Sequence, residues 1–191
     1  PDISKFEGRT FNGFHRADGR VGSANYWLVV PMVFCENQNV EVIKNALLNE
    51  LGYAKASQFQ GYTQSLINAY KNGVDVSALV YEETEQTEEG RGKLFPQVDG
   101  IKFLTHTGGC GGTREDAQVL CQLLAGYITH PNVAGATILS LGCQNAQVKL
   151  LQDAIAKVDP QFSKPLYIFD QQAIGNEEQM LRQAIKQTFI G

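Results

Sequence analysis

The sequence has no hydrophobic run long enough to cross a membrane and no excess of positive charge. None of its apolar stretches approaches the roughly 20 residues that a transmembrane helix needs. Sixteen lysines and arginines are outnumbered by 20 aspartates and glutamates, which gives a net charge of −4. This balance provides no electrostatic basis for binding nucleic acid or an anionic membrane surface, so we expect neither as a partner.

Cysteine is scarce and widely spaced. Cys35, Cys110, Cys121 and Cys143 form no CxxC pair, and the start of the chain, 1–5, lacks the basic-then-apolar pattern of a secretory signal. We therefore expect a reduced, cytoplasmic setting without a disulfide framework. An initiator methionine is also missing, which leads us to expect a piece of a longer protein. Internal repeats and low-complexity tracts are absent.

Apolar strands and amphipathic helices alternate along most of the 191 residues. This alternation predicts an α/β fold with a mostly parallel sheet and helices on both faces, a Rossmann-like three-layer sandwich. We expect a glycine- and arginine-rich loop segment over 1–25 and a single α/β domain over 26–191. The acidic stretch 82–92 is expected to be a solvated loop, with a mobile lid as the alternative. The predicted strands cover 26–34, 74–81, 101–105, 136–141 and 165–169, and the predicted helices cover 39–51, 61–70, 113–127, about 145–158 and 176–189.

A glycine loop joins the strand at 101–105 to the helix that follows it. Four glycines at 108, 109, 111 and 112 permit tight turns and a close approach to a ligand. Thr113 and Asp116 have the spacing of a capping box, which places the loop at a helix N-terminus where an anion is favoured. The loop fits neither the GxGxxG nor the Walker pattern. A small carboxylate is therefore a better candidate ligand than a nucleotide.

Several residues that could perform chemistry follow predicted strands directly, so they should meet at the carboxyl edge of the sheet. His106 and Cys110 follow one strand, Cys143 follows another, and both Cys35 and Asp170 follow further strands. Such a set could hold a transition metal with an open coordination position. His106 could also be a general base, whereas Cys143 could equally be a small packing residue. His130 could simply cap the helix that it ends, and Cys121 is expected in the core.

Five segments of the chain resemble the altronate/galactarate dehydratase family. They are 16–22 (RADGRVG), 106–116 (HTGGCGGTRED), 129–135 (THPNVAG), 141–144 (LGCQ) and 164–172 (KPLYIFDQQ). Together they span nearly the whole chain, which resembles a central domain of these longer enzymes. The sequence departs from the broader family at Gln144, where a glutamate is expected, and at Ala24, where an arginine is expected.

The resemblance implies dehydration of altronate to a 2-keto-3-deoxy sugar acid, with galactarate as the alternative substrate. It also implies a divalent metal, Fe²⁺ or Mn²⁺, that acidifies the proton beside the carboxylate. Open alternatives are an iron–sulfur cluster on Cys35, Cys110 and Cys143, and a non-catalytic substrate-binding or scaffold domain. The chain could form a homo-oligomer. We expect the isolated chain to fold but to dehydrate altronate poorly or not at all. The implied catalytic residues are His106 and Cys110; the metal ligands are His106, Cys110 and Cys143; the substrate-binding residues are Arg16, Arg20, Gly109, Gly111 and Thr113.

Overall fold

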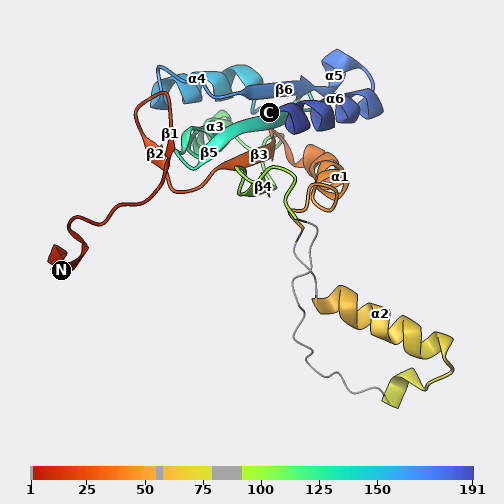
Figure 1. The fold of residues 1–191 in the computed structure, drawn as a ribbon. Helices are drawn as coiled ribbons and strands as arrows, with labels where there is room; N and C mark the ends of the chain where they lie inside the picture. The colour runs from red at the N-terminus through yellow and green to blue at the C-terminus, as the bar shows by residue number, and fades with distance from the viewer. Residues whose placement is uncertain (1, 55–57, 79–91) are drawn as a thin grey trace. The chain divides into compact units, whose positions relative to one another are not determined.

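A computed structural model describes residues 2–54, 58–78 and 92–191 of the chain (Figure 1). The contacts divide the chain into two compact units. One unit consists of Pro1–Leu47 and Phe95–Gly191, and the other consists of Leu48–Leu94. The first unit holds the sheet and all the residues proposed above for chemistry.

The first unit is built on a four-stranded parallel sheet with the strand order β4-β3-β5-β6. Its strands are β3 (Tyr26–Pro31), β4 (Gly100–Phe103), β5 (Val133–Ser140) and β6 (Leu166–Asp170). Val29 is the partner of both Phe103 in β4 and Thr137 in β5, which makes β3 a central strand. The short strands β1 (Phe14–His15) and β2 (Val21–Gly22) form a separate antiparallel pair.

Helices cover both faces of this sheet, which confirms the predicted α/β sandwich. Leu28 and Val30 of β3 pack into one core with residues of α3 and α4. Because side chains alternate along a strand, Trp27 lies on the opposite face. There its indole donates to Thr137 Oγ1, which lies 2.7 Å from the Thr188 hydroxyl of α6. The helices of this unit are α1 (Asn37–Leu47), α3 (Arg114–Thr129), α4 (Val148–Val158), α5 (Gln171–Ile174) and α6 (Glu177–Ile190), with 3₁₀ turns η1 (Ser4–Phe6) and η2 (Phe34–Glu36).

The second unit contains α2 (Gln58–Lys71) and the 3₁₀ turn η3 (Val76–Ala78). The helix predicted over 61–70 is confirmed and extends further at both ends. The strand predicted over 74–81 is wrong at 76–78, because these residues form the η3 turn after an Asp75 side chain that accepts from Ser77. Residues 79–81, and nearly all of the acidic stretch 82–92, lie outside the described residues.

Element ends differ from the sequence predictions where loops take over. The strand expected over 26–34 stops at Pro31, since the chain leaves the sheet and winds into η2. The strand expected from Ala136 begins three residues earlier, at Val133. Pairing already starts there, because Tyr26 N, at the start of β3, donates to the carbonyl oxygen of Asn132, the residue before β5. In the part of the chain that the structure describes, no helix is long and apolar enough to span a bilayer.

Candidate functional site

The carboxyl ends of β3 and β5 form the topological switch point of the sheet. The connection after β3 leads to β4 on one side, and the connection after β4 leads to β5 on the other side. Ligands of open α/β sheets bind at such a point. The glycine loop, 106–113, lies directly on it, because Phe34 N donates to Gly108 O and Ala146 N donates to Gly109 O, each over 3.0 Å.

Close backbone packing fixes the conformation of this loop. Gly109 has φ +100°, and a Cβ there would overlap the carbonyl of Met32. Gly112 has φ +89°, where a Cβ would meet the Asp116 carboxylate. Gly111, by contrast, faces open space. Two of the loop glycines are therefore required by backbone geometry, whereas Gly111 leaves room for a ligand.

The loop turns its carbonyl groups towards the protein. These carbonyls accept hydrogen bonds from neighbouring loops, whereas the N–H groups of residues 109–112 have no acceptor within the described ranges of the chain. A row of free N–H groups before a helix N-terminus favours an anion. The inward bonds are Asn37 Nδ2 to His106 O (2.8 Å), Phe34 N to Gly108 O, Ala146 N to Gly109 O, and Asn145 Nδ2 to Cys110 O (2.8 Å).

Thr113 and Asp116 form the predicted capping box at the start of α3. The Asp116 amide donates to Thr113 Oγ1 (3.2 Å), and Thr113 N donates to Asp116 Oδ2 (2.7 Å). Hydrogen bonds from the backbone and side chain of Thr113 lower the pKa of Asp116. The polar groups of Thr113 are thus used by the cap, while the N–H groups of Gly109 and Gly111 have no acceptor among the described residues.

Both ring nitrogens of His106 are engaged within the protein. Nε2 lies 2.7 Å from the carbonyl oxygen of Pro31, which can only accept, so Nε2 carries the proton. Nδ1 accepts from the Gly108 amide over 3.2 Å. In this conformation His106 offers no free lone pair to a metal or a substrate proton, and its ring joins β3 to the glycine loop.

The structure separates one buried cysteine from three exposed ones, and the core position predicted for Cys121 is confirmed. Cys121 is buried in the core, and burial raises the pKa of its thiol to about 11. Cys35, Cys110 and Cys143 are exposed free thiols. Among the residues that the structure describes, no three His, Cys, Asp or Glu side chains converge closely enough for a metal ion. The donor set predicted for a metal or an iron–sulfur cluster therefore does not fit, and we assign no step to either group.

A buried polar network, which sequence reasoning missed, supports the loop after β5. Gln144 is 1% exposed; its Oε1 accepts from Gly142 N (2.7 Å), and its Nε2 donates to Ser140 Oγ (2.8 Å). Ser140 in turn donates to Asp170 Oδ2 (2.8 Å). The sequence had drawn attention to Asp170 at a strand end and to Gln144 in the LGCQ segment, but no pattern of spacing linked either residue to Ser140.

Glu36 is a second buried polar residue at this edge that the sequence did not reveal. Its Oε2 accepts from Asn39 Nδ2 (2.8 Å). Burial raises the pKa of Glu36, and the nearby charges of Glu177 and Asp170 act in the same direction. Sequence reasoning had singled out the neighbouring, exposed Cys35 instead.

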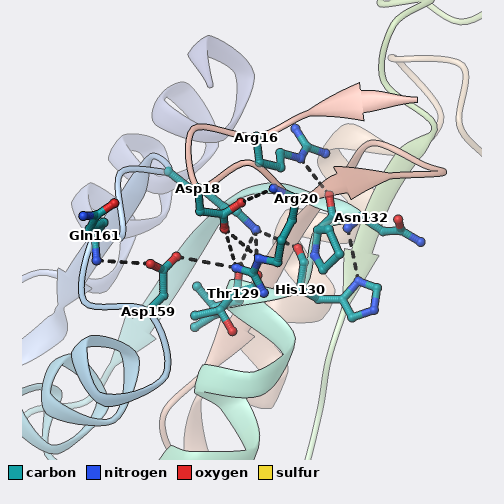
Figure 2. Close-up of polar contacts among 11 residues, drawn as sticks. Arg16, Asp18, Arg20, Thr129, His130, Asn132, Asp159 and Gln161 are labelled. Atoms are coloured by element: carbon teal, nitrogen blue, oxygen red, sulfur yellow. Dashed lines mark hydrogen bonds and ion pairs between the residues drawn. The ribbon is translucent and has the colours of Figure 1, made fainter. Parts of the chain in front are cut away.

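Arg16 and Arg20 lie at the opposite, amino edge of the sheet (Figure 2). Arg16 Nε donates to Pro131 O (2.7 Å), and Arg20 Nη2 donates to Thr129 O (2.8 Å), where α3 ends and β5 is about to begin. The eight residues of β5 separate this edge from the glycine loop by roughly 25 Å at the usual rise per residue. The chain therefore does not bring the two arginines to His106, Cys110 and Cys143.

Comparison with known proteins gives a consistent assignment. A family model described as "D-galactarate dehydratase/Altronate hydrolase, second domain" matches residues 13–190. The chain is 26% identical to the altronate dehydratase of Bacillus subtilis (strain 168) over 153 residues, which are 80% of this chain and 22% of that protein. It is 23% identical to the altronate dehydratase of Escherichia coli (strain K12) over 148 residues, 78% of this chain and 22% of that protein. The chain thus spans about a fifth of the length of these relatives. No solved structure matches it.

Proposed function

Because this chain belongs to the D-galactarate dehydratase/altronate hydrolase family, we propose that it is the domain of a sugar-acid dehydratase that holds the substrate carboxylate. The reaction class is the loss of water from a polyhydroxy acid, which gives a 2-keto-3-deoxy acid. Altronate is the proposed substrate and galactarate is the alternative, since curated relatives carry the name altronate dehydratase and the family description includes both activities.

The single observation that carries this proposal is the orientation of the glycine loop. Its carbonyls are bonded inward, and the N–H groups of residues 109–112 have no acceptor in the described part of the chain. Gly111 leaves open space in front of them. Removal of the proton beside a carboxylate places additional negative charge on the carboxylate oxygens. Fixed N–H donors that already face these oxygens would stabilise that charge as it develops.

The residues that transfer protons are a separate part of the proposal. Cys110 is exposed on the same loop, next to the free N–H groups, and so can reach a bound substrate. His106 could act only after its bonds to Pro31 and Gly108 open. Gln144 has no carboxyl group that could transfer a proton, and its side-chain amide is hydrogen-bonded within the buried network.

The proposal can be tested by NMR titration of the ¹⁵N-labelled protein with altronate and, separately, galactarate. We expect saturable shifts of the Gly109, Cys110, Gly111 and Gly112 amide signals. The matching polyols, altritol and galactitol, lack a carboxylate and should leave these signals unchanged. Equal shifts with acid and polyol, or no shifts at these four amides, would contradict the proposal.

A matched pair of glycine substitutions sharpens this test. Gly111→Ala adds a methyl group in open space, so it should leave the fold intact and weaken binding about tenfold or more by crowding the ligand. Gly109→Ala forces a Cβ against Met32 at φ +100°, so it should destabilise the loop itself. Formation of 2-keto acid by the same samples reports turnover, which the binding assay does not require.

A further inference from the structure

Arg16, at the amino edge of the sheet, lines a hollow that the proposed dehydration does not use. The hollow has a volume of about 210 Å³. Four separate segments of the chain form its walls: the β1–β2 turn, the start of β5, the residue after α4, and the approach to β6. The side chains that matter for its chemistry are Arg16, Asp18, Asp159, Ser163 and Lys164.

Most of the charged groups around this hollow are already held in place. Arg20 bonds to Asp18 through Nε (2.7 Å) and lies 3.5 Å from Asp159 (Figure 2). Lys164 Nζ donates to the carbonyl oxygens of Thr129 (3.1 Å) and His130 (2.6 Å) at the end of α3. These bonds give the hollow rigid walls, and its ligand-binding groups need no rearrangement.

Arg16 has a donor left over. Its Nε donates to Pro131 O, and its Nη2 donates to Ala24 O and Asn25 Oδ1. Its other terminal nitrogen, Nη1, has no acceptor among the residues that the structure describes. A half-buried guanidinium with a free nitrogen at the wall of a polar hollow is suited to an oxyanion.

Positive charge also exceeds negative charge here. Three cations, Arg16, Arg20 and Lys164, face two carboxylates, Asp18 and Asp159. Burial, together with the positive charges of Arg16 and Arg20, lowers the pKa of Lys164 to about 8. The carboxylates of Asp18 and Asp159 raise this pKa, but by less than the two arginines lower it. A bound anion would supply the missing negative charge.

We propose that this hollow is a second binding site, for a small anion with a carboxylate or phosphate group that bonds to Arg16 Nη1 and the Ser163 hydroxyl beside Lys164. The site lies at the opposite end of β5 from the glycine loop and does not depend on the dehydratase proposal. Lys164 contributes charge, because its own hydrogen bonds go to carbonyl groups.

The test is an NMR titration of the ¹³C,¹⁵N-labelled protein at pH 7 with sodium D-gluconate and, separately, inorganic phosphate. Sodium chloride at the same ionic strength is the control. We expect saturable shifts of the Arg16 guanidinium signals and of the Ser163 and Lys164 amides, and the anion that causes them identifies the ligand group. Shifts no larger than those in chloride with both anions would overturn the proposal.

The pH dependence of binding gives a readout that a purely structural cluster would not change. A bound anion favours protonated Lys164, so it should raise the pKa of that lysine by about one unit from its value of about 8. By linkage, binding at pH 10 should then be about tenfold weaker than at pH 6. The charged groups that face Lys164 are Arg16, Asp18 and Arg20 from the hairpin and Asp159 after α4. A Lys164 pKa that is the same with and without anion would overturn the proposal.

Substitutions at the hollow, compared with one on the exposed face of α4, test which side chains bind the anion. Arg16→Lys keeps the charge but removes Nη1, and should weaken binding about tenfold. Ser163→Ala changes only an exposed hydroxyl and should weaken binding about threefold without affecting the fold. Lys149→Gln, on the exposed face of α4, should bind as the unmodified chain does. Unchanged affinity in Ser163→Ala and in a folded Arg16→Lys would contradict the assignment.

Discussion

Gln144 shows how a single side chain can fix the direction of a buried network. Its amide accepts from Gly142 and donates to Ser140, so the only proton of the Ser140 hydroxyl is directed to Asp170. A glutamate has the same shape but no N–H to donate. Two carboxylates would then compete for one hydroxyl proton, and a buried charge would be left uncompensated.

We therefore predict that Gln144→Glu lowers the free energy of unfolding by about 1–3 kcal/mol at pH 7. Burial would raise the folded-state pKa of the new carboxyl above its unfolded value, so the loss should diminish as the pH falls through the folded pKa. Urea unfolding at pH 7 and pH 5, followed by the fluorescence of the single tryptophan, Trp27, measures the loss of stability and its change with pH. Gln152→Glu, on the exposed face of α4, is the control. A deficit that stays constant with pH would contradict this account.

His106 and Cys110 should respond differently to truncation. The His106 ring connects Pro31 to Gly108, so His106→Ala should cost about 1–3 kcal/mol of stability. Cys110 is exposed, so Cys110→Ser should change stability by less than about 0.5 kcal/mol. Thermal unfolding measures both, with the exposed His15→Ala as control.

The metal content of the purified protein tests the ligand roles that the resemblance implies for the same two residues. A role as a metal ligand requires that metal is lost in His106→Ala and Cys110→Ser. Unchanged metal content in both variants would remove these residues from any metal site.

At the scale of elements, the start of α3 decides the shape of the glycine loop. Thr113→Ala removes the side-chain half of the capping box and should destabilise the protein by about 1 kcal/mol. Hydrogen bonds from Thr113 lower the pKa of Asp116. Asp116 therefore stabilises the fold above its unfolded pKa, and this contribution is lost as the pH falls through the folded pKa.

The acid side of the stability profile checks this interpretation. Unfolding free energies between pH 5 and pH 2 should fall less steeply in Thr113→Ala than in the unmodified chain. Gln118→Ala, an exposed position one turn further along α3, should keep the original slope. Identical slopes in all three proteins would show that the cap does not perturb Asp116.

At the scale of the whole molecule, a hydrogen bond joins the two ends of the unit Leu48–Leu94. Leu94 N donates to Leu51 O over 3.1 Å. Two residues between these positions would form a β-turn with the same hydrogen bond. We predict that replacing residues 52–93 by Asn-Gly leaves the sheet unit folded, with a loss of no more than about 1–2 kcal/mol.

Cooperative urea unfolding and an unchanged Trp27 emission spectrum would support this prediction. Loss of the cooperative transition would show instead that residues 26–191 form one indivisible domain, as the sequence led us to expect. The full chain, measured in parallel, is the reference.

The sequence by itself determined the local features of this protein. The apolar alternation of β5 and β6, the stripe of α3 and the Thr113–Asp116 spacing depend on near neighbours, and their periods are visible along the chain. The strand ends that carry His106, Cys110 and Cys143 followed from the same periodicity. The strand expected at 74–81 failed at Val76–Ala78, because a local side-chain turn at Asp75 outweighed a short apolar run.

Only the tertiary structure decided which of these residues meet. Parallel pairing placed the glycine loop at one end of β5 and the two arginines at the other, so residues that the sequence grouped into one site form two. Packing also gave His106 two partners and turned the loop carbonyls inward, while the N–H groups of 109–112 have no acceptor among the described residues. Hydrogen bonds between distant segments leave no period in a sequence, and these bonds determine what the glycine loop can bind.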